Sequence, residues 1–188
     1  MENIDNIKQM WNDLNRRLES VEQENQRLAN NIMRSNLKST REKLIGKYKK
    51  FIFVEFIMFL SVGILIYNGA QVEIYKIPAL ITWEVFFLAE ALLDYYLMNR
   101  LQNIDIYTSP LCEISSIAQK NWKIHRIAII AGLPFALVCV ALFALCLGSD
   151  KFILLGILVG FIVGSIIGVL ELRKFIKYYK ELQNNNIN

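Results

Sequence analysis

The sequence predicts an all-α protein, a four-helix transmembrane bundle with an N-terminal amphipathic or coiled-coil helix and a basic C-terminal helix. Three observations predict this class. Hydrophobic residues make up 54% of the 188 residues, which is high for a soluble domain, and they gather in four long apolar runs. Residues 1–50 hold 11 of the 21 lysines and arginines. Before the first run, apolar side chains recur every three or four positions, as in a coiled coil.

The N-terminal helix, residues 1–36, is expected to be a cytoplasmic coiled coil. Its heptad seam consists of Ile4, Ile7, Trp11, Leu14, Leu18, Val21, Asn25, Leu28 and Ile32. Asn25 favours a parallel pair in fixed register, because two buried amides bond each other and a slipped register leaves them unpaired. The bulk of Trp11 counts against an ideal two-stranded seam. The alternatives are a different helical partner and a helix that folds back on its own chain or on the membrane surface.

The seam ends after Ile32, and a flexible joint is expected near Asn36. Ser39 and Glu42 have the spacing of a capping box, in which the two side chains bond the free amides at the start of a helix. We therefore expect a second helix to begin here and to lead into a membrane domain over residues 37–182.

The membrane domain contains four apolar runs of spanning length. They cover about residues 51–67, 78–100, 127–147 and 152–170. Residues 110–121 are predicted to form an amphipathic helix in the membrane interface, because apolar and polar side chains take opposite faces. After the last span the chain continues as a basic helix, and residues 183–188 form a polar tail.

The fourth span repeats glycine at every fourth position, at Gly156, Gly160, Gly164 and Gly168. Overlapping G-x-x-x-G units leave bare backbone along one face and let another helix approach closely. The expected partner is the third span, which a short connection joins to the fourth. The first span, the second span and another copy of the protein are the alternatives.

The basic residues fix the expected orientation. Of the 21 lysines and arginines, Lys76 and Lys151 alone lie on the side of the two short loops, and the other 19 lie on the side of both termini. The positive-inside rule therefore places both termini in the cytoplasm. We expect a multi-pass protein of the bacterial inner (plasma) membrane, in contact with the lipid bilayer. The first apolar run begins only at Phe51, so a cleavable signal peptide is not expected.

Four acids lie within the predicted spans: Glu55 in the first, and Glu84, Glu90 and Asp94 in the second. A carboxylate at the bilayer centre costs about 2.5–3.5 kcal/mol, so these groups are expected to face the bundle interior or a wet cavity. Glu90 and Asp94 lie one turn apart on nearly the same face, with Glu84 turned roughly 120° away. Crowded carboxylates cannot all ionise cheaply, so at least one should hold a proton unless a cation pairs with it.

These four acids form a candidate proton or cation site. The alternatives are structural contacts between helices, and acids that reach water through a longer or tilted helix. The basic residues considered as their partners, all near the cytoplasmic edge, are Arg100, Lys123, Arg126 and Arg173.

No catalytic, cofactor or metal site is predicted, and we do not expect an enzyme. The sequence has no G-x-S-x-G, Walker or H-E-x-x-H motif, and its single histidine, His125, is too few for a triad or a zinc site. His125 is expected to be an interfacial side chain. Cys112, Cys139 and Cys146 lack C-x-x-C spacing and are expected to be packing thiols. The basic residues form no compact module, so nucleic acid is not an expected partner.

The segment IKQMWNDLNRRLE contains the seam residues Ile7, Trp11, Leu14 and Leu18. With the layout of the rest of the chain, it resembles small, uncharacterised four-span bacterial inner-membrane proteins that begin with a cytoplasmic heptad segment and end in a basic helix. The resemblance covers the chain as a layout. It implies an accessory role in regulation or in the cell envelope and supplies no site residue.

Together these features predict a non-enzymatic integral membrane protein that presents a cytoplasmic coiled coil. The coiled coil would serve self-association into a homo-oligomer or recruitment of a soluble helical protein, as in a regulatory or scaffold protein. The alternative is a small proton- or cation-coupled transporter that uses Glu90 and Asp94.

Overall fold

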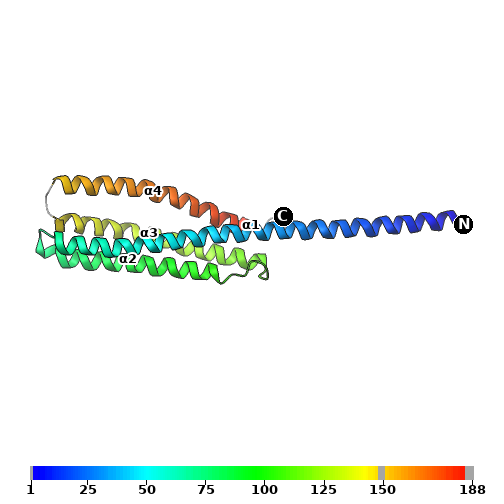
Figure 1. Ribbon diagram of the computed structural model, residues 1–188, viewed down its shortest axis with the longest axis horizontal. Helices are drawn as coiled ribbons and strands as arrows, with labels where there is room; N and C mark the ends of the chain where they lie inside the picture. The colour runs from blue at the N-terminus through cyan, green and yellow to red at the C-terminus, as the bar shows by residue number, and fades with distance from the viewer. Residues whose placement is uncertain (1, 148–150, 185–188) are drawn as a thin grey trace. The chain divides into compact units, whose positions relative to one another are not determined.

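The computed structural model describes residues 2–147 and 151–184, which contain helices and turns but no strand (Figure 1). The four helices are α1 (Glu2–Gly69), α2 (Glu73–Gln102), α3 (Leu111–Leu147) and α4 (Lys151–Gln183). Part of the predicted polar tail, residues 185–188, lies outside the described residues, as do the side chains of the predicted seam residues Ile4 and Ile7. Consecutive helices run in alternate directions, so the fold is all-α and antiparallel (Figure 1).

Three helices, α1, α3 and α4, are long and apolar enough to cross a membrane. α2 is not among them, because every membrane-length stretch of it holds at least three charged residues. The charges responsible are chiefly Glu84, Glu90 and Asp94. Length and composition therefore support three of the four predicted spans. Whether α2 can also cross a membrane depends on whether its neighbours shelter its acids from lipid.

The chain divides into two compact units, Met1–Ser39 and Thr40–Asn188. α1 is helical through this division, and the predicted joint near Asn36 lies within the helix. The predicted capping box of Ser39 and Glu42 is therefore wrong. A capping box bonds amides that have no partner at a helix start, and here the preceding turn already supplies the carbonyls.

In the second unit, α1 buries one face at spacings of three and four residues. The buried and half-buried residues of this face are Thr40, Leu44, Tyr48, Phe51, Glu55, Met58, Val62 and Ile66. Such a stripe is typical of a helix packed in a bundle. Glu55 occupies one position of this stripe, so the fold carries its carboxylate toward the interior.

The first three helices share a hydrophobic core near the loop between α1 and α2. Its buried members are Val62, Ile66, Ala79, Trp83, Cys139 and Cys146. The two thiols that were predicted to serve packing lie seven residues apart on one face of α3 and are buried in this core. The backbone amides of Gln71 and Val72 donate to the Cys146 carbonyl at 3.0 and 3.2 Å. These bonds tie the loop to the last turn of α3.

α2 begins at Glu73 rather than at the predicted Pro78. An acid in the first turn interacts favourably with the helix dipole, and Glu73 also pairs with Lys76 at 3.7 Å. Pro78 consequently lies inside the helix, where its missing amide removes one backbone hydrogen bond. The favourable charge of Glu73 therefore lets the helix begin before Pro78, the residue that was expected to be its first.

α3 joins the predicted interfacial segment, residues 110–121, to the third span without interruption. Ile114 and Ala118 are buried, so the apolar face of this part of α3 packs against protein. Asn121 is fully buried; its Nδ2 donates to the carbonyl oxygen of Leu97 at 3.3 Å, whereas its Oδ1 has no hydrogen-bond partner among the described residues. The segment is thus continuous with the rest of α3 and not a separate helix, and its apolar face covers protein, because amphipathic spacing does not distinguish a lipid partner from a protein partner.

α4 contacts the other helices mainly through its C-terminal half. Phe175, Tyr179 and Leu182 are buried, whereas almost every described side chain in residues 155–170 is exposed. Figure 1 shows α4 apart from its neighbours at its start and closer to them toward its end. A Cβ on any of the four repeated glycines would meet no atom within 4 Å. The third span therefore does not pack on the glycines, because α4 diverges from α3 along this stretch.

Candidate functional site

The candidate site is a cavity of about 350 Å³ lined by residues of all four helices, which we call the acidic cavity. Its titratable lining residues are Glu55 of α1, Glu90 and Asp94 of α2, His125 of α3 and Glu171 of α4. Much of the remaining wall is aromatic and consists of Phe51, Phe86, Phe87 and Phe175. A concave, mostly apolar wall with a few convergent polar groups is typical of small-molecule sites, and this volume falls within their usual range.

Helix geometry explains how the acids meet. Glu90 and Asp94 are one turn apart on α2, so both reach the same cavity. Glu55 comes from the buried stripe of α1. The structure thus brings together three of the four predicted candidate residues. Glu84 is not among them, since it faces α1 on another side of α2.

Two glycines make room for the acids of α2. A Cβ on Gly132 of α3 would lie 2.9 Å from Oε1 of Glu90, and a Cβ on Gly63 of α1 would lie 3.2 Å from Oε1 of Glu84. Both distances are shorter than an ordinary contact, so a larger residue at either position would displace the carboxylate. Gly132 therefore helps to set the position of Glu90 in the cavity.

The three inner acids have no basic partner within the described residues. None of the ion pairs found there involves Glu55, Glu90 or Asp94. Asp94 is only 6% exposed, and Oε2 of Glu55 is buried without a hydrogen-bond partner. Buried carboxylates without a cation are costly. This arrangement suits groups that share protons or bind a positively charged ligand.

The basic residues considered as partners do not take that role. In the part of the chain that the structure describes, Arg100, Lys123, Arg126 and Arg173 form no ion pair with the three acids. Arg100 instead lies over the ring of Tyr96, with 5.6 Å between the guanidinium carbon and the ring centroid.

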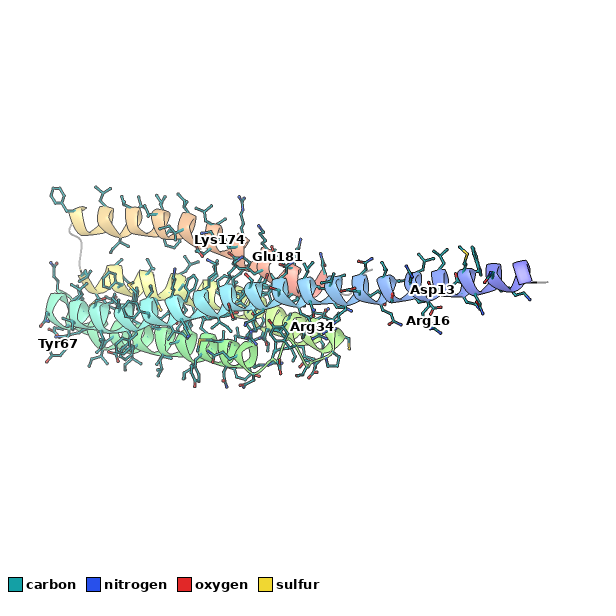
Figure 2. All side chains as sticks on the ribbon, turned by 45° about the vertical axis from the view of Figure 1, so that its right-hand side comes forward. Asp13, Arg16, Arg34, Tyr67, Lys174 and Glu181 are labelled. Atoms are coloured by element: carbon teal, nitrogen blue, oxygen red, sulfur yellow. The ribbon has the colours of Figure 1, made fainter. Side chains whose placement is uncertain are left out.

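Glu171, the fourth acid of the cavity, is already paired. Its carboxylate accepts hydrogen bonds from the Lys47 ammonium and, at 2.6 Å, from the Lys174 ammonium. Lys174 lies on the part of α4 that runs beside α1 (Figure 2). The cavity therefore has a neutralised acid at the lysine-bearing end and unpaired acids further along α1 and α2.

An aromatic cluster that the sequence analysis did not predict lies beside the cavity and contributes His125 and Phe175 to its wall. The His125 ring stacks on Phe175 with centroids 4.9 Å apart, and its edge contacts Tyr48 at 5.9 Å. The hydroxyls of Tyr48 and Tyr179 share a hydrogen bond of 2.8 Å, which joins α1 to α4. His125 is half-buried and forms part of the cavity wall, a role that the sequence did not predict. The sequence feature that could have indicated this cluster is the helical spacing of Leu44, Tyr48 and Phe51 in a segment rich in lysine.

No family model, curated protein or solved structure matches this chain. The chemistry of the site is therefore what indicates the function of this chain.

The first unit presents a different feature, an exposed apolar seam. The seam residues Trp11, Leu14, Leu18, Val21, Leu28 and Ile32 are all exposed. Asn25 is exposed as well, and the flanking Asp13 and Arg17 pair at 3.0 Å in solvent. Figure 2 shows the side chains of Asp13 and Arg16 projecting away from this part of α1.

Proposed function

We propose that this chain is a four-span integral membrane protein that acts as a small proton- or cation-coupled transporter through the acidic cavity. The observation that carries the proposal is the convergence of Glu55, Glu90 and Asp94, without an ion pair to any described residue, on one cavity. Ionisable groups at membrane depth are costly and commonly mark substrate or proton pathways. α2 is then the fourth span, and the other three helices shelter its acids.

The proposed orientation places both termini in the cytoplasm of a bacterial cell and the four spans in its inner membrane. It is supported by the distribution of basic residues, because Lys76 and Lys151 are the only two of 21 on the side of the short loops. The lysine-bearing end of the acidic cavity then faces the cytoplasm.

The substrate class follows from the wall of the cavity. Carboxylates attract a positive charge, and the phenylalanine rings offer dispersion and cation–π contacts to an apolar cation. A hydrated inorganic ion makes no use of the aromatic wall. We therefore assign an organic cation with an apolar body as the substrate and protons as the coupling ion.

Exchange is the mechanism that this geometry supports. Carboxylates that share one cavity interact strongly, so their protonation states are coupled. A bound cation stabilises the ionised carboxylates and releases a proton, and protonation in turn releases the cation. Glu90 and Asp94 alternate between the two ligands, and Glu55 completes the set from the opposite helix.

The test uses purified full-length protein in lipid vesicles, with ethidium as the probe cation. An outward proton gradient should drive ethidium uptake, and Glu90→Gln should lower the initial rate by at least about tenfold, because one charged contact is worth about 1.5–3 kcal/mol. Glu84→Gln is the matched control, since it removes an equal charge from α2 outside the cavity. Absence of uptake across a panel of organic and inorganic cations, or equal losses in both variants, would refute the proposal.

The exposed seam favours a second candidate function, self-association through a cytoplasmic coiled coil. Apolar side chains at heptad spacing gain free energy when a second helix covers them, and Asn25 would fix the register of a parallel pair. This function is compatible with transport, because it uses the other unit of the chain.

Cross-linking of native copies tests the seam. Leu14→Asp with Leu18→Asp should abolish dimer cross-links, because two charges would be buried at the interface. Gln9→Asp with Gln23→Asp adds the same charge on the opposite helix face and should leave the cross-links intact. Unchanged cross-linking in the first variant argues against self-association through this seam.

A further inference from the structure

A second pocket, of opposite charge, adjoins the acidic cavity. Its volume is about 270 Å³, and we call it the basic pocket; it is lined by Lys47, Lys50, Phe51, Val54, Glu171 and Lys174. Three ammonium groups there face one carboxylate. Phe51, Val54 and Glu171 line both spaces, so the basic pocket lies at the lysine-bearing end of the acidic cavity, between α1 and α4.

Two of the three lysines of the basic pocket, Lys47 and Lys174, are held in place by contacts. Glu171 binds both Lys47 and Lys174, and the Lys47 side chain is only 17% exposed. The Lys47 ammonium also lies 5.9 Å from the ring centroid of Phe175. Each ammonium carries three N–H donors, so binding to Glu171 leaves further donors for an anion. Lys50, which is exposed, adds a third positive charge beside them.

The apolar members of the pocket indicate what kind of anion fits. Phe51 is the first residue of the apolar run of α1, and Val54, one turn later, is largely exposed. The pocket therefore places lysines that can bind a phosphate beside apolar side chains that can contact hydrocarbon. A free anion would contact only the lysines, whereas a phospholipid would contact the lysines with its headgroup and the apolar residues with its acyl chains. Basic pockets between helices at a membrane surface are known to hold anionic headgroups.

We propose that the basic pocket binds the headgroup phosphate of an anionic phospholipid, with the acyl chains lying beside Val54. This inference goes beyond the proposed transport and does not depend on it, because it uses the lysines and not the unpaired acids. The bound lipid would occupy the gap between α1 and α4 at the end where α4 joins the bundle.

Lipid binding to the full-length protein in detergent is measured by native mass spectrometry, with phosphatidylglycerol as the probe. Each basic side chain near an anionic group contributes roughly fivefold to affinity, so the triple variant Lys47→Gln, Lys50→Gln, Lys174→Gln should bind about 100-fold more weakly. The matched control is Lys120→Gln, Lys123→Gln, Lys177→Gln. It removes equal charge from exposed lysines outside the pocket and should bind within about twofold of wild type.

Two further binding measurements distinguish a lipid headgroup from free phosphate as the ligand of the pocket. Phosphatidylcholine has the same phosphate without net charge and should bind at least about tenfold more weakly than phosphatidylglycerol. Inorganic phosphate in large excess should not displace the lipid. Displacement by phosphate at the lipid's own concentration would overturn the proposal in favour of a free-anion site, and equal binding by the two triple variants would overturn it in favour of general surface attraction.

Lys50→Gln alone keeps the test decisive if the triple variant does not fold. Lys50 forms no ion pair among the described side chains, so its replacement leaves the Lys47–Glu171–Lys174 contacts intact. Phosphatidylglycerol should bind about fivefold more weakly to this variant. A folded Lys50→Gln protein with wild-type affinity would contradict the assignment.

Discussion

Replacing Gly132 with alanine should displace the Glu90 carboxylate without unfolding the bundle. The added Cβ would lie 2.9 Å from Oε1 of Glu90, and ordinary contact begins at 3.4 Å, so the oxygen must move by about 0.5 Å. The atom that must move is the end of a flexible side chain, so a change of rotamer relieves the overlap. The substitution therefore acts on the position of one functional group.

The two contributions to stability nearly cancel. Alanine in a helix interior is favoured over glycine by about 1 kcal/mol. A glutamate forced off its preferred rotamer costs about 0.5–1.5 kcal/mol. The free energy of unfolding should thus change by less than about 1 kcal/mol. Loss of about half of a charged contact worth about 1.5–3 kcal/mol should weaken cation binding roughly three- to tenfold.

The measurement is ethidium affinity by fluorescence titration of the purified protein, with thermal unfolding recorded on the same samples. Gly63→Ala is the matched control, because its Cβ would lie 3.2 Å from the carboxylate of Glu84, outside the acidic cavity. It should retain wild-type affinity. The reasoning fails if Gly132→Ala binds ethidium normally, or if Gly63→Ala loses as much affinity.

Three more outcomes follow from the contacts and the exposure of single residues. Tyr48→Phe should lower the free energy of unfolding by about 0.5–1.5 kcal/mol, because it removes the buried hydrogen bond to Tyr179, whose hydroxyl keeps its bond to Asn121; a variant as stable as wild type in unfolding experiments would contradict this. Cys112 should react with maleimide in the folded protein and the two buried thiols only after unfolding, and labelling of three thiols at one rate would contradict the packing described. In whole cells, an impermeant reagent should label a cysteine placed at Gln71 and not one placed at Ser20, and the reverse pattern would refute the proposed orientation.

Helix content and the pairing of two acids were predictable because both depend on local spacing. Apolar periodicity indicated helices over most of the chain, and a separation of four residues put Glu90 and Asp94 on one face. The start of α2 was misplaced because the charge of Glu73 outweighed the expected role of Pro78. Element type follows from the pattern, whereas an exact boundary depends on small local energies.

Glu55 was predicted to join those acids because a carboxylate inside an apolar run must face the interior, whereas the place of His125 beside them was not predictable from the sequence. Apart from Glu55 and Ser61, residues 51–67 are apolar on every side, because lipid and protein interior accept the same side chains, so little else in their composition marks the buried face of α1. The glycine repeat of α4 shows the same limit. It permits a close helix contact, but it does not say whether protein or lipid fills the space, and in this chain no neighbouring helix does.

Glu171 lines both the acidic cavity and the basic pocket and couples their electrostatics. It is the only carboxylate among the described lining residues of the acidic cavity that lysines neutralise, and the same lysines line the basic pocket. An anionic headgroup bound to the remaining N–H donors of Lys47 and Lys174 would offset their positive charge, so these lysines would neutralise less of the charge of Glu171. The lysine-bearing end of the cavity would then attract cations more strongly when the lipid is bound. In the proposed transporter, the content of anionic lipid and the affinity for cations should therefore rise together, and Glu171→Gln should remove that dependence.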